Sequence, residues 1–367
     1  MIDDLWDWFV EKELEYEEEG DQERLAMASL HADAFELGES NPQGMLRMLK
    51  DGRARARRLG EPWWTYLYEV WIAMTYQDNL GDLRNGLTEA LHCVNEGRKP
   101  ALQGHPWRIA AHNTLLAAYI DVDPLGYAQA IEACIKELSR EIPRNSFEHR
   151  YVMLEHQRTY LLICGRYQQA RRIALRALNL FERDFLGDDW YVIHAFLDLC
   201  LIAFHDRNVE GLLAAVEPVE EIARSHETAQ LDHSEAQVWQ AIAARLQGDE
   251  KRAKRLFRSA SNRTVRLRKK PRLRHYEAIA AFHELGEDLE RCLEVRDEQL
   301  AHIQNTGRFG YECDVRIKRC ELLARLDRLK PRDLAKARDS LKPLKNPQPY
   351  RKRLDKLAGP GTRQRRA

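Results

Sequence analysis

Residues 247–260, QGDEKRAKRLFRSA, place a glycine turn directly before a helical pattern. The apolar residues recur at the i, i+3, i+4, i+7 spacing of one helix face: Ala253, Leu256, Phe257 and Ala260. The five Lys and Arg residues among them fall on the opposite face. The stretch therefore predicts an amphipathic helix that starts after Gly248, buries one side and exposes a basic one.

The same turn-then-helix pattern recurs along the chain. The turns stand at positions 81, 125, 165, 206, 248 and 286, which are 38 to 44 residues apart. Another unit fits before them with its turn near Gly38, and one more fits after them near residues 326–332. Strand-like alternation of Val, Ile and Thr is nearly absent. Because a lone helical hairpin cannot bury both of its apolar faces, we expect an all-α solenoid, a superhelix of about eight antiparallel helical hairpins.

Two of these units resemble the tetratricopeptide repeat (TPR). GRYQQARRIALRAL follows its Gly-x-Tyr-x-x-Ala-x6-Ala-Leu signature at Gly165, Tyr167, Ala170, Ala177 and Leu178. GDEKRAKRLFRSA matches at Gly248, Ala253, Phe257 and Ala260, whereas Gly86 and Gly211 replace the first Ala in other units. The long spacing resembles that of maltose-regulator-type transcription activators. The resemblance covers roughly residues 25–345 and implies a right-handed superhelix in which small residues allow close helix packing and aromatic rings fill the gap between repeats.

The resemblance also implies that the first helix of each hairpin lines a concave groove. Counting back from the turns gives these groove-facing positions: Trp71, Thr75, Asp78, Glu155, Thr159, Arg272, Tyr276 and His283. Arg158 falls in the packing layer, so either the count is one residue off or Arg158 reaches into the groove. Trp and Tyr dominate binding hot spots, so we expect Trp71 and Tyr276 to fix a segment of another protein. The aromatic residues of EPWWTYLYEVWIA either fill the space between repeats or form an exposed anchor.

The two ends of the chain differ in charge. Residues 1–39 hold fourteen acids and two bases, whereas residues 328–367 hold fourteen bases and three acids. We expect three parts: an acidic capping helix at residues 1–20, a TPR-like array at 21–345, and a basic, partly disordered helix and tail at 346–367. The capping helix is expected to dock through Leu5, Trp6 and Phe9.

A basic stretch supports an alternative hypothesis. Twelve Lys or Arg and no acid lie between Lys251 and Tyr276, and the helix is expected to end near Asn262, which leaves residues 263–271 as a solvated linker. The candidate basic patch is Arg263, Arg266, Arg268, Lys269, Lys270 and Arg274. It would contact nucleic acid or another polyanion together with the basic C-terminus. No sequence-reading module accompanies it, and the acidic N-terminal segment of this or a neighbouring copy is an equally good partner.

Motifs for chemistry are missing from the sequence. It has no Gly-x4-Gly-Lys-Ser/Thr loop, no His-Glu-x-x-His and no Gly-x-Ser-x-Gly, so we expect neither an enzyme nor a cofactor or metal site. The seven cysteines form no Cys-x-x-Cys and sit mostly in apolar helical stretches, as in a reducing compartment. No basic signal region or apolar run of about 18 residues appears. We expect a cytoplasmic, non-catalytic scaffold or signalling adaptor that binds a protein segment in its groove.

Overall fold

The computed structural model describes residues 5–38, 40–143, 146–184, 192–267, 271–304 and 306–358. These residues form 18 α-helices and no β-strand. The prediction of an all-α solenoid of about eight antiparallel hairpins is confirmed. Two compact units make up the chain. Unit 1 comprises Met1–His156 and Asn305–Arg308, and unit 2 comprises Gln157–Gln304 and Phe309–Ala367.

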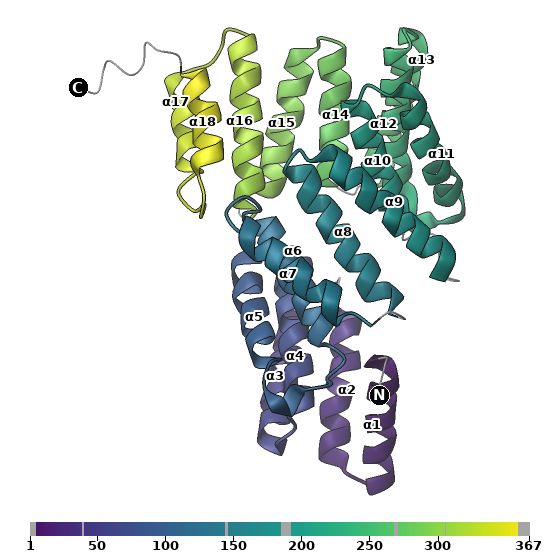
Figure 1. Cartoon of the computed structure of the whole chain (residues 1–367), viewed down its shortest axis with the longest axis vertical. Coiled ribbons are helices and arrows are strands. Elements are labelled where there is room, and N and C mark those ends of the chain that lie inside the picture. Colours follow the sequence, from purple (N-terminus) through teal and green to yellow (C-terminus); the bar gives the residue numbers. More distant parts are fainter. Residues whose placement is uncertain are drawn as a thin grey trace, which may run out of the picture. The chain divides into compact units, whose positions relative to one another are not determined.

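Unit 1 contains a capping helix, α1 (Leu5–Glu19), and three hairpins (Figure 1). The hairpins are α2 (Gln22–Leu37) with α3 (Pro42–Leu59), α4 (Pro62–Met74) with α5 (Leu83–Glu96), and α6 (Arg108–Val122) with α7 (Ala128–Glu141). A π-helix, Thr75–Asn79, continues α4, and a 3-10 turn, Pro100–Leu102, precedes α6. The boundary between the units falls within α8 (Phe147–Ile163).

Unit 2 continues the hairpin pattern to the end of the described chain. Its hairpins are α8 with α9 (Tyr167–Asp184), α10 (Ile193–His205) with α11 (Val209–Ser225), α12 (Gln230–Leu246) with α13 (Glu250–Leu267), α14 (Leu273–Leu285) with α15 (Leu289–Ile303), and α16 (Phe309–Arg325) with α17 (Pro331–Asp339). The last helix is α18 (Gln348–Leu357). We call α2, α4, α6, α8, α10, α12, α14 and α16 the first helices. Within unit 1, α4 contacts α6, and within unit 2, α12 contacts both α10 and α14.

The hairpins of unit 2 share one turn geometry. In each turn a single residue adopts a left-handed backbone: Gly165, Arg207, Gly248, Glu287 and Asp327. Its amide donates to the carbonyl three residues back, and the next amide donates to the carbonyl five residues back, as in Gly165 to Leu162 and Arg166 to Leu161. These bonds satisfy carbonyls at the end of the first helix, which ends it and reverses the chain.

Contacts between neighbouring hairpins repeat with the period seen in the sequence. Side-chain hydrogen bonds join residues 37, 39, 40 and 41 positions apart, in both units. Small residues hold the helices close, because Ala253 and Ala260 are fully buried within α12–α13 packing. Phe257 stacks on Phe282 of the next hairpin with ring centroids 4.1 Å apart. The aromatic ring thus fills the gap between repeats, as the sequence predicts.

The capping helix docks through Trp8 and Phe9. Trp8 is buried and its ring lies 5.0 Å from that of Trp64 and 5.6 Å from that of His105. Phe9 is buried against His31 and Trp64, as expected. The side chains of Leu5 and Trp6 lie outside the described residues. Trp8 is a docking residue that the sequence analysis missed, because helix periodicity alone does not distinguish it from Trp6.

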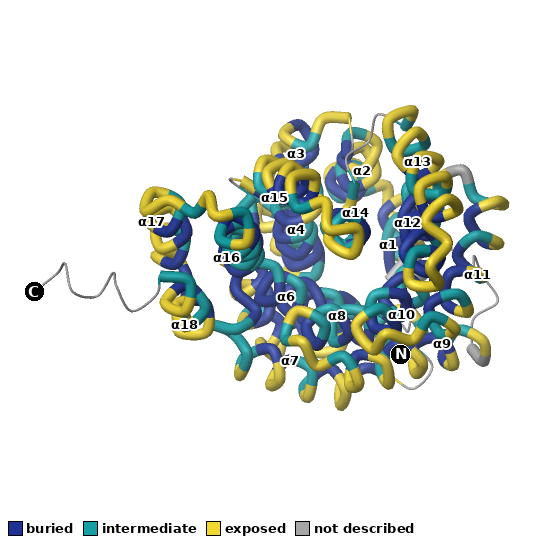
Figure 2. The backbone as a smooth tube through the Cα atoms, turned by 90° about the horizontal axis from the view of Figure 1, so that it is seen from above, coloured by how far each residue is buried: buried dark blue, intermediate teal, exposed yellow. Residues whose placement is uncertain are grey.

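The end of α13 differs from the prediction, and parts of the predicted linker and tail lie outside the described residues. Helix α13 runs to Leu267 rather than Asn262, so Arg263 and Arg266 are helical and the predicted linker is shorter. Residues 268–270, with Arg268, Lys269 and Lys270, lie outside the described residues, as do residues 359–367 of the predicted tail. Figure 2 shows α13 exposed along much of its length. Within the described chain, no helix combines the length and apolar character that crossing a membrane requires.

Candidate functional site

An aromatic row crosses the first helices of unit 1. Phe35 of α2 meets Trp71 of α4 edge to face at 4.1 Å, and Trp71 lies 4.6 Å from Trp107, which precedes α6. Phe35 is 38% exposed, and Trp71 is half-buried. Trp64 and Tyr68 of the same aromatic-rich stretch are buried, so they fill the space between helices. Trp71 therefore has part of its ring open to solvent, beside the exposed Phe35. We call the surface formed by Phe35 and Trp71 the first-helix face.

Two carboxylates and one guanidinium group lie in the same unit. Arg308 Nη2 lies 3.0 Å from Asp121 Oδ2. Asp78 is exposed, yet surrounding protein raises its pKa to about 6, mainly by desolvation and then by the charge of Asp121, against the opposing charge of Arg308. The ionised form of Asp78 is thus disfavoured here, and an added cation would stabilise it.

The π-helix changes the register between Trp71 and Asp78. Thr75 is predicted to face the groove but is fully buried, and its hydroxyl donates to Trp71 O at 2.8 Å, so that prediction is wrong. Thr75 lies in this π-helix, whose turn is wider than that of an α-helix, so counting back from Gly81 with α-helical spacing misplaces Thr75. It also brings Gln77 against α5: a Cβ on Gly86 would lie 2.4 Å from Gln77 Cγ, which explains why alanine is replaced there.

A buried charge ladder, defined as Arg158, Asp198, Arg274 and Glu235, runs across the first helices of unit 2. Arg158 Nε lies 2.5 Å from Asp198 Oδ2, and Arg274 Nη1 lies 3.1 Å from Asp198 Oδ1. Arg274 Nε lies 2.6 Å from Glu235 Oε1. Burial alone would lower the pKa of Arg274, but the charges of Glu235 and Asp198 raise it, so it stays a cation.

Three predicted site residues of unit 2 are buried or paired and are therefore wrong: Arg158 and Arg274, which belong to the ladder, and Tyr276. Arg158 is 1% exposed and lies in the packing layer, bonded to Asp198, rather than in the groove. Arg274 belongs to the ladder and not to an exposed basic patch, because its cation is held by Glu235 and Asp198. Tyr276 is also buried, packed in a core with Ala280 and Cys292, so its ring does not reach a partner. On α14 the count is one residue off, since the neighbouring Glu277 takes the polar position.

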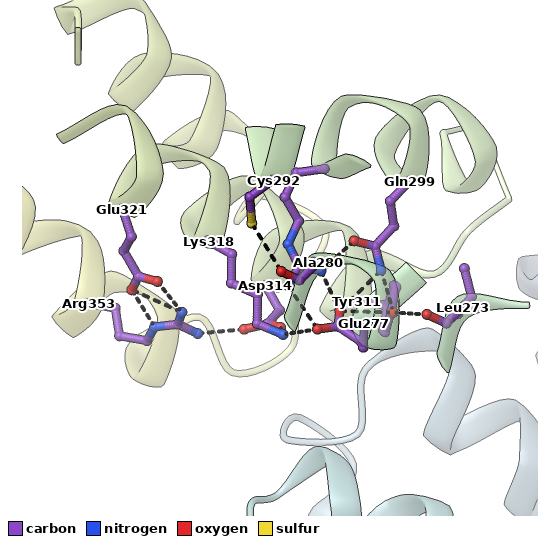
Figure 3. Close-up of polar contacts among 11 residues, drawn as sticks. Leu273, Glu277, Ala280, Cys292, Gln299, Tyr311, Asp314, Lys318, Glu321 and Arg353 are labelled. Carbon is purple, nitrogen blue, oxygen red and sulfur yellow. Dashed lines mark hydrogen bonds and ion pairs between the residues drawn. The ribbon is translucent and has the colours of Figure 1, made fainter. Parts of the chain in front are cut away.

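Glu277 is the centre of a second polar cluster, the Glu277 network (Figure 3). Its members are Glu277, Arg296, Gln299, Tyr311, Asp314, Lys318, Glu321 and Arg353. Glu277 accepts from Arg296 Nη1 at 2.7 Å and from Lys318 Nζ at 3.1 Å. Asp314 bonds Lys318 at 2.9 Å and Arg353 at 2.5 Å. The network joins α14, α15, α16 and α18.

Charges in the Glu277 network are balanced and stabilise one another. Burial alone would raise the pKa of Glu277, but the charges of Lys318 and Arg296 and their hydrogen bonds hold it well below its usual range. Burial alone would lower the pKa of Lys318, which the charges of Glu277 and Asp314 instead raise. Both side chains remain half-buried, so solvent reaches the network from one side. Since each carboxylate already has a cation, we assign this network to holding the last hairpins together.

The other predicted groove residues remain at least partly exposed to solvent. Glu155 and Thr159 of α8 are half-buried. Arg272 is exposed, lies 3.5 Å from Asp232 and also contacts His194. His283 is half-buried, 3.8 Å from Asp288 and edge-on to Phe257. Their role in a groove stays a prediction.

The basic stretch separates into engaged and exposed parts. Arg263 donates to Gln230 Oε1 at 2.7 Å. Arg266 is exposed near the end of α13.

In the described parts of the chain, no group of three or more His, Cys, Asp or Glu side chains could hold a metal ion. No protein-family model matches the chain, and no curated protein matches it. The likeness to TPR proteins therefore rests on the turn and packing residues alone.

Proposed function

We propose that this protein is a non-catalytic scaffold of the TPR type that binds a segment of another protein on its first-helix face. The observation that carries the proposal is the Phe35–Trp71 pair. An exposed phenylalanine supported edge-on by a half-buried tryptophan, on neighbouring first helices, presents a rigid apolar surface. Such aromatic side chains supply much of the binding free energy at protein interfaces.

Charged side chains of the same unit indicate the chemistry of the bound segment. Asp78 and Asp121 supply two carboxylates, and Arg308 supplies one guanidinium group. The balance is one negative charge, and the raised pKa of Asp78 means that a partner cation would be bound favourably. We therefore propose a segment with an apolar or aromatic side chain against Phe35 and Trp71, and a Lys or Arg side chain directed at Asp78.

A displayed library of random peptides tests this proposal. Peptides selected on the full chain should share an apolar residue and a basic residue at a fixed spacing. The binding of one selected peptide is then measured by calorimetry for the wild-type chain and its variants. Trp71→Ala should weaken binding at least about 30-fold, which corresponds to the 2 kcal/mol of a hot spot. Asp78→Asn should weaken it less and reduce its dependence on salt.

A matched control uses an exposed apolar residue elsewhere. Leu175→Ala on α9 removes an exposed apolar side chain from another helix and should leave the affinity unchanged. Selected peptides without a shared pattern, or equal losses for Trp71→Ala and Leu175→Ala, would refute the assignment of this face.

The alternative function, contact with nucleic acid or another polyanion, has fewer available cations than the sequence predicts, because two of them pair with carboxylates. Arg272 pairs with Asp232, and Arg274 pairs with Glu235 and Asp198. The other exposed cations of the described stretch lie on α13.

A further inference from the structure

Helix α13 presents an exposed basic face on the outside of its hairpin. Its exposed cations are Lys251, Arg252, Lys254, Arg255, Arg258 and Arg266. Apart from Lys254, which lies 3.3 Å from Glu250, none of them forms an ion pair with another described residue. Lys251, Arg255, Arg258 and Arg266 recur at helical spacing, with Asn262 between them, so they form one basic stripe. Of the basic patch predicted from the sequence, only Arg266 lies in this stripe.

The same face carries an exposed apolar residue. Val265 is 76% exposed, the largest value among the exposed large hydrophobic residues of the described chain. A phosphate backbone gains nothing from an aliphatic side chain, whereas a helix that combines apolar and acidic residues does. The face therefore fits an amphipathic acidic helix better than it fits a nucleic acid.

Helix α1 of the chain has these properties. It contains seven acids and one base, a net charge of −6, whereas α13 contains seven bases and one acid, a net charge of +6. The side of α1 turned away from its buried Trp8 and Tyr16 exposes Val10 (53%) and Leu14 (52%), one turn apart. Glu11, Glu17 and Glu18 on that side are exposed as well. The helices have 15 and 18 residues, so their lengths match within about one turn.

Helix α1 carries acids at the end that its own dipole disfavours, and α13 carries two bases near its N-terminus, although its Glu250 and Arg266 suit its dipole. α1 ends in Glu17, Glu18 and Glu19 with no basic residue in its last turn. α13 begins with Lys251 and Arg252 beside the single acid Glu250. Acids at a helix C-terminus and bases at an N-terminus are unfavourable. Antiparallel pairing of α1 with α13 would place Glu17, Glu18 and Glu19 beside Lys251 and Arg252.

We propose that α1 of one copy of this chain docks on the basic face of α13 of a second copy. Two helices bury a small area and the attraction is largely between exposed charges, so the association is weak and sensitive to salt. This proposal concerns a different surface from the Phe35–Trp71 face, so either can fail without the other.

Light scattering coupled to size exclusion tests the proposal with the full chain. At roughly 10–100 µM protein and low salt, the wild-type chain should have a mass above that of the monomer. Raising the salt to about 0.5 M should return it to the monomer. Glu17→Lys/Glu18→Lys and Arg255→Glu/Arg258→Glu should each weaken association at least roughly tenfold, because like charges then face each other. Unchanged circular dichroism confirms that the substituted chains fold.

Mixing supplies the decisive measurement. Each double variant keeps one intact face, so an equimolar mixture should associate again although neither variant does alone. The matched control is Arg171→Glu/Arg172→Glu, which reverses two exposed arginines on another helix, α9, and should associate as the wild type does.

Four results would overturn the proposal. They are a wild-type chain that stays monomeric at low salt, a mixture that stays monomeric, an α9 variant that loses association equally, and a monomeric chain that binds a labelled oligonucleotide through Arg255 and Arg258 in fluorescence anisotropy.

Discussion

Arg158 Nε lies 2.5 Å from Asp198 Oδ2, and the two side chains keep 1% and 6% of their surface in contact with solvent. They belong to α8 and α10, first helices of neighbouring hairpins, and stand 40 residues apart. The other oxygen of Asp198 accepts from Arg274 of α14. One buried carboxylate therefore lies between two guanidinium groups from different repeats, and it connects three first helices of unit 2.

Replacing Asp198 with alanine should destabilise unit 2 strongly. The change leaves Arg158 and Arg274 without this carboxylate in a buried position, and breaking a buried pair costs about 3–5 kcal/mol. Urea denaturation followed by circular dichroism measures the free energy of unfolding. Glu290→Ala is the control, because it removes an exposed partner of Arg328 and should cost less than about 1 kcal/mol. Similar losses for both variants would contradict a structural role for the buried carboxylate.

Substituting the left-handed turn residue Glu287 should stabilise the chain. Glu287 has a φ of 55°, and Gly248, which holds the equivalent position in the preceding hairpin, has a φ of 82°. In this conformation the Cβ of a residue other than glycine destabilises the folded chain by roughly 1–2 kcal/mol. Glycine avoids this cost, but it loses more conformational entropy on folding, so the net gain from the substitution is smaller. Glu287→Gly should therefore raise the free energy of unfolding by about 0.5–1 kcal/mol. The reverse change, Gly248→Ala, should lower it by about 1 kcal/mol. A destabilised Glu287→Gly would show that another contact of Glu287 outweighs the backbone term.

These turns explain why the hairpins could be predicted from the sequence. A turn is determined by a few adjacent residues, and the apolar spacing on either side is local as well. All eight hairpins follow from such signals, including the three turns with Arg207, Glu287 and Asp327 in place of glycine.

The side chains at the candidate site were harder to predict, since their surroundings come from distant parts of the chain. The π-helix at Thr75–Asn79 adds a wide turn that has no clear sequence signal, so counting along the helix misplaces Thr75. Arg274 looks like any basic residue of its stretch until Asp198, 76 residues away, is placed beside it. Likewise, Tyr276 and Glu277 differ by one position, and a count over a whole repeat does not resolve that difference.

His105 should titrate far below an ordinary histidine. Burial lowers its pKa to about 4, against a smaller opposing effect of its hydrogen bond to Trp63. Its Nε2 lies 3.1 Å from Trp63 O, while Nδ1 accepts from Trp107 N–H at 3.1 Å. The neutral ring with its proton on Nε2 satisfies both bonds, whereas protonated Nδ1 could not accept. Long-range nitrogen–proton NMR should show this tautomer and a pKa near 4.

The sign of the resulting pH dependence follows from the lowered pKa. The unfolded chain binds a proton at His105 below about 6.5, and the folded chain does so only near 4. The stability from the neutral ring is therefore complete above pH 6.5 and is lost as the pH falls toward 4. The full loss is about 3 kcal/mol. A measured pKa near 6.5 would contradict both the burial and the two hydrogen bonds of this ring.

Glu277 should make the last hairpins sensitive to acid. Its pKa is held well below its usual range, because the charges of Lys318 and Arg296 outweigh the effect of burial. An acid whose pKa is lowered by folding contributes stability that is complete above its unfolded pKa of about 4.3 and is lost as the pH falls through the folded value. Glu277→Gln should therefore lower the urea midpoint at pH 7, and the difference from wild type should shrink as the pH falls below 4. Glu290→Gln, which changes an exposed pair with Arg328, should leave the midpoint nearly unchanged at every pH. A constant difference between Glu277→Gln and wild type from pH 7 to pH 3 would mean that Glu277 acts through packing rather than through its charge.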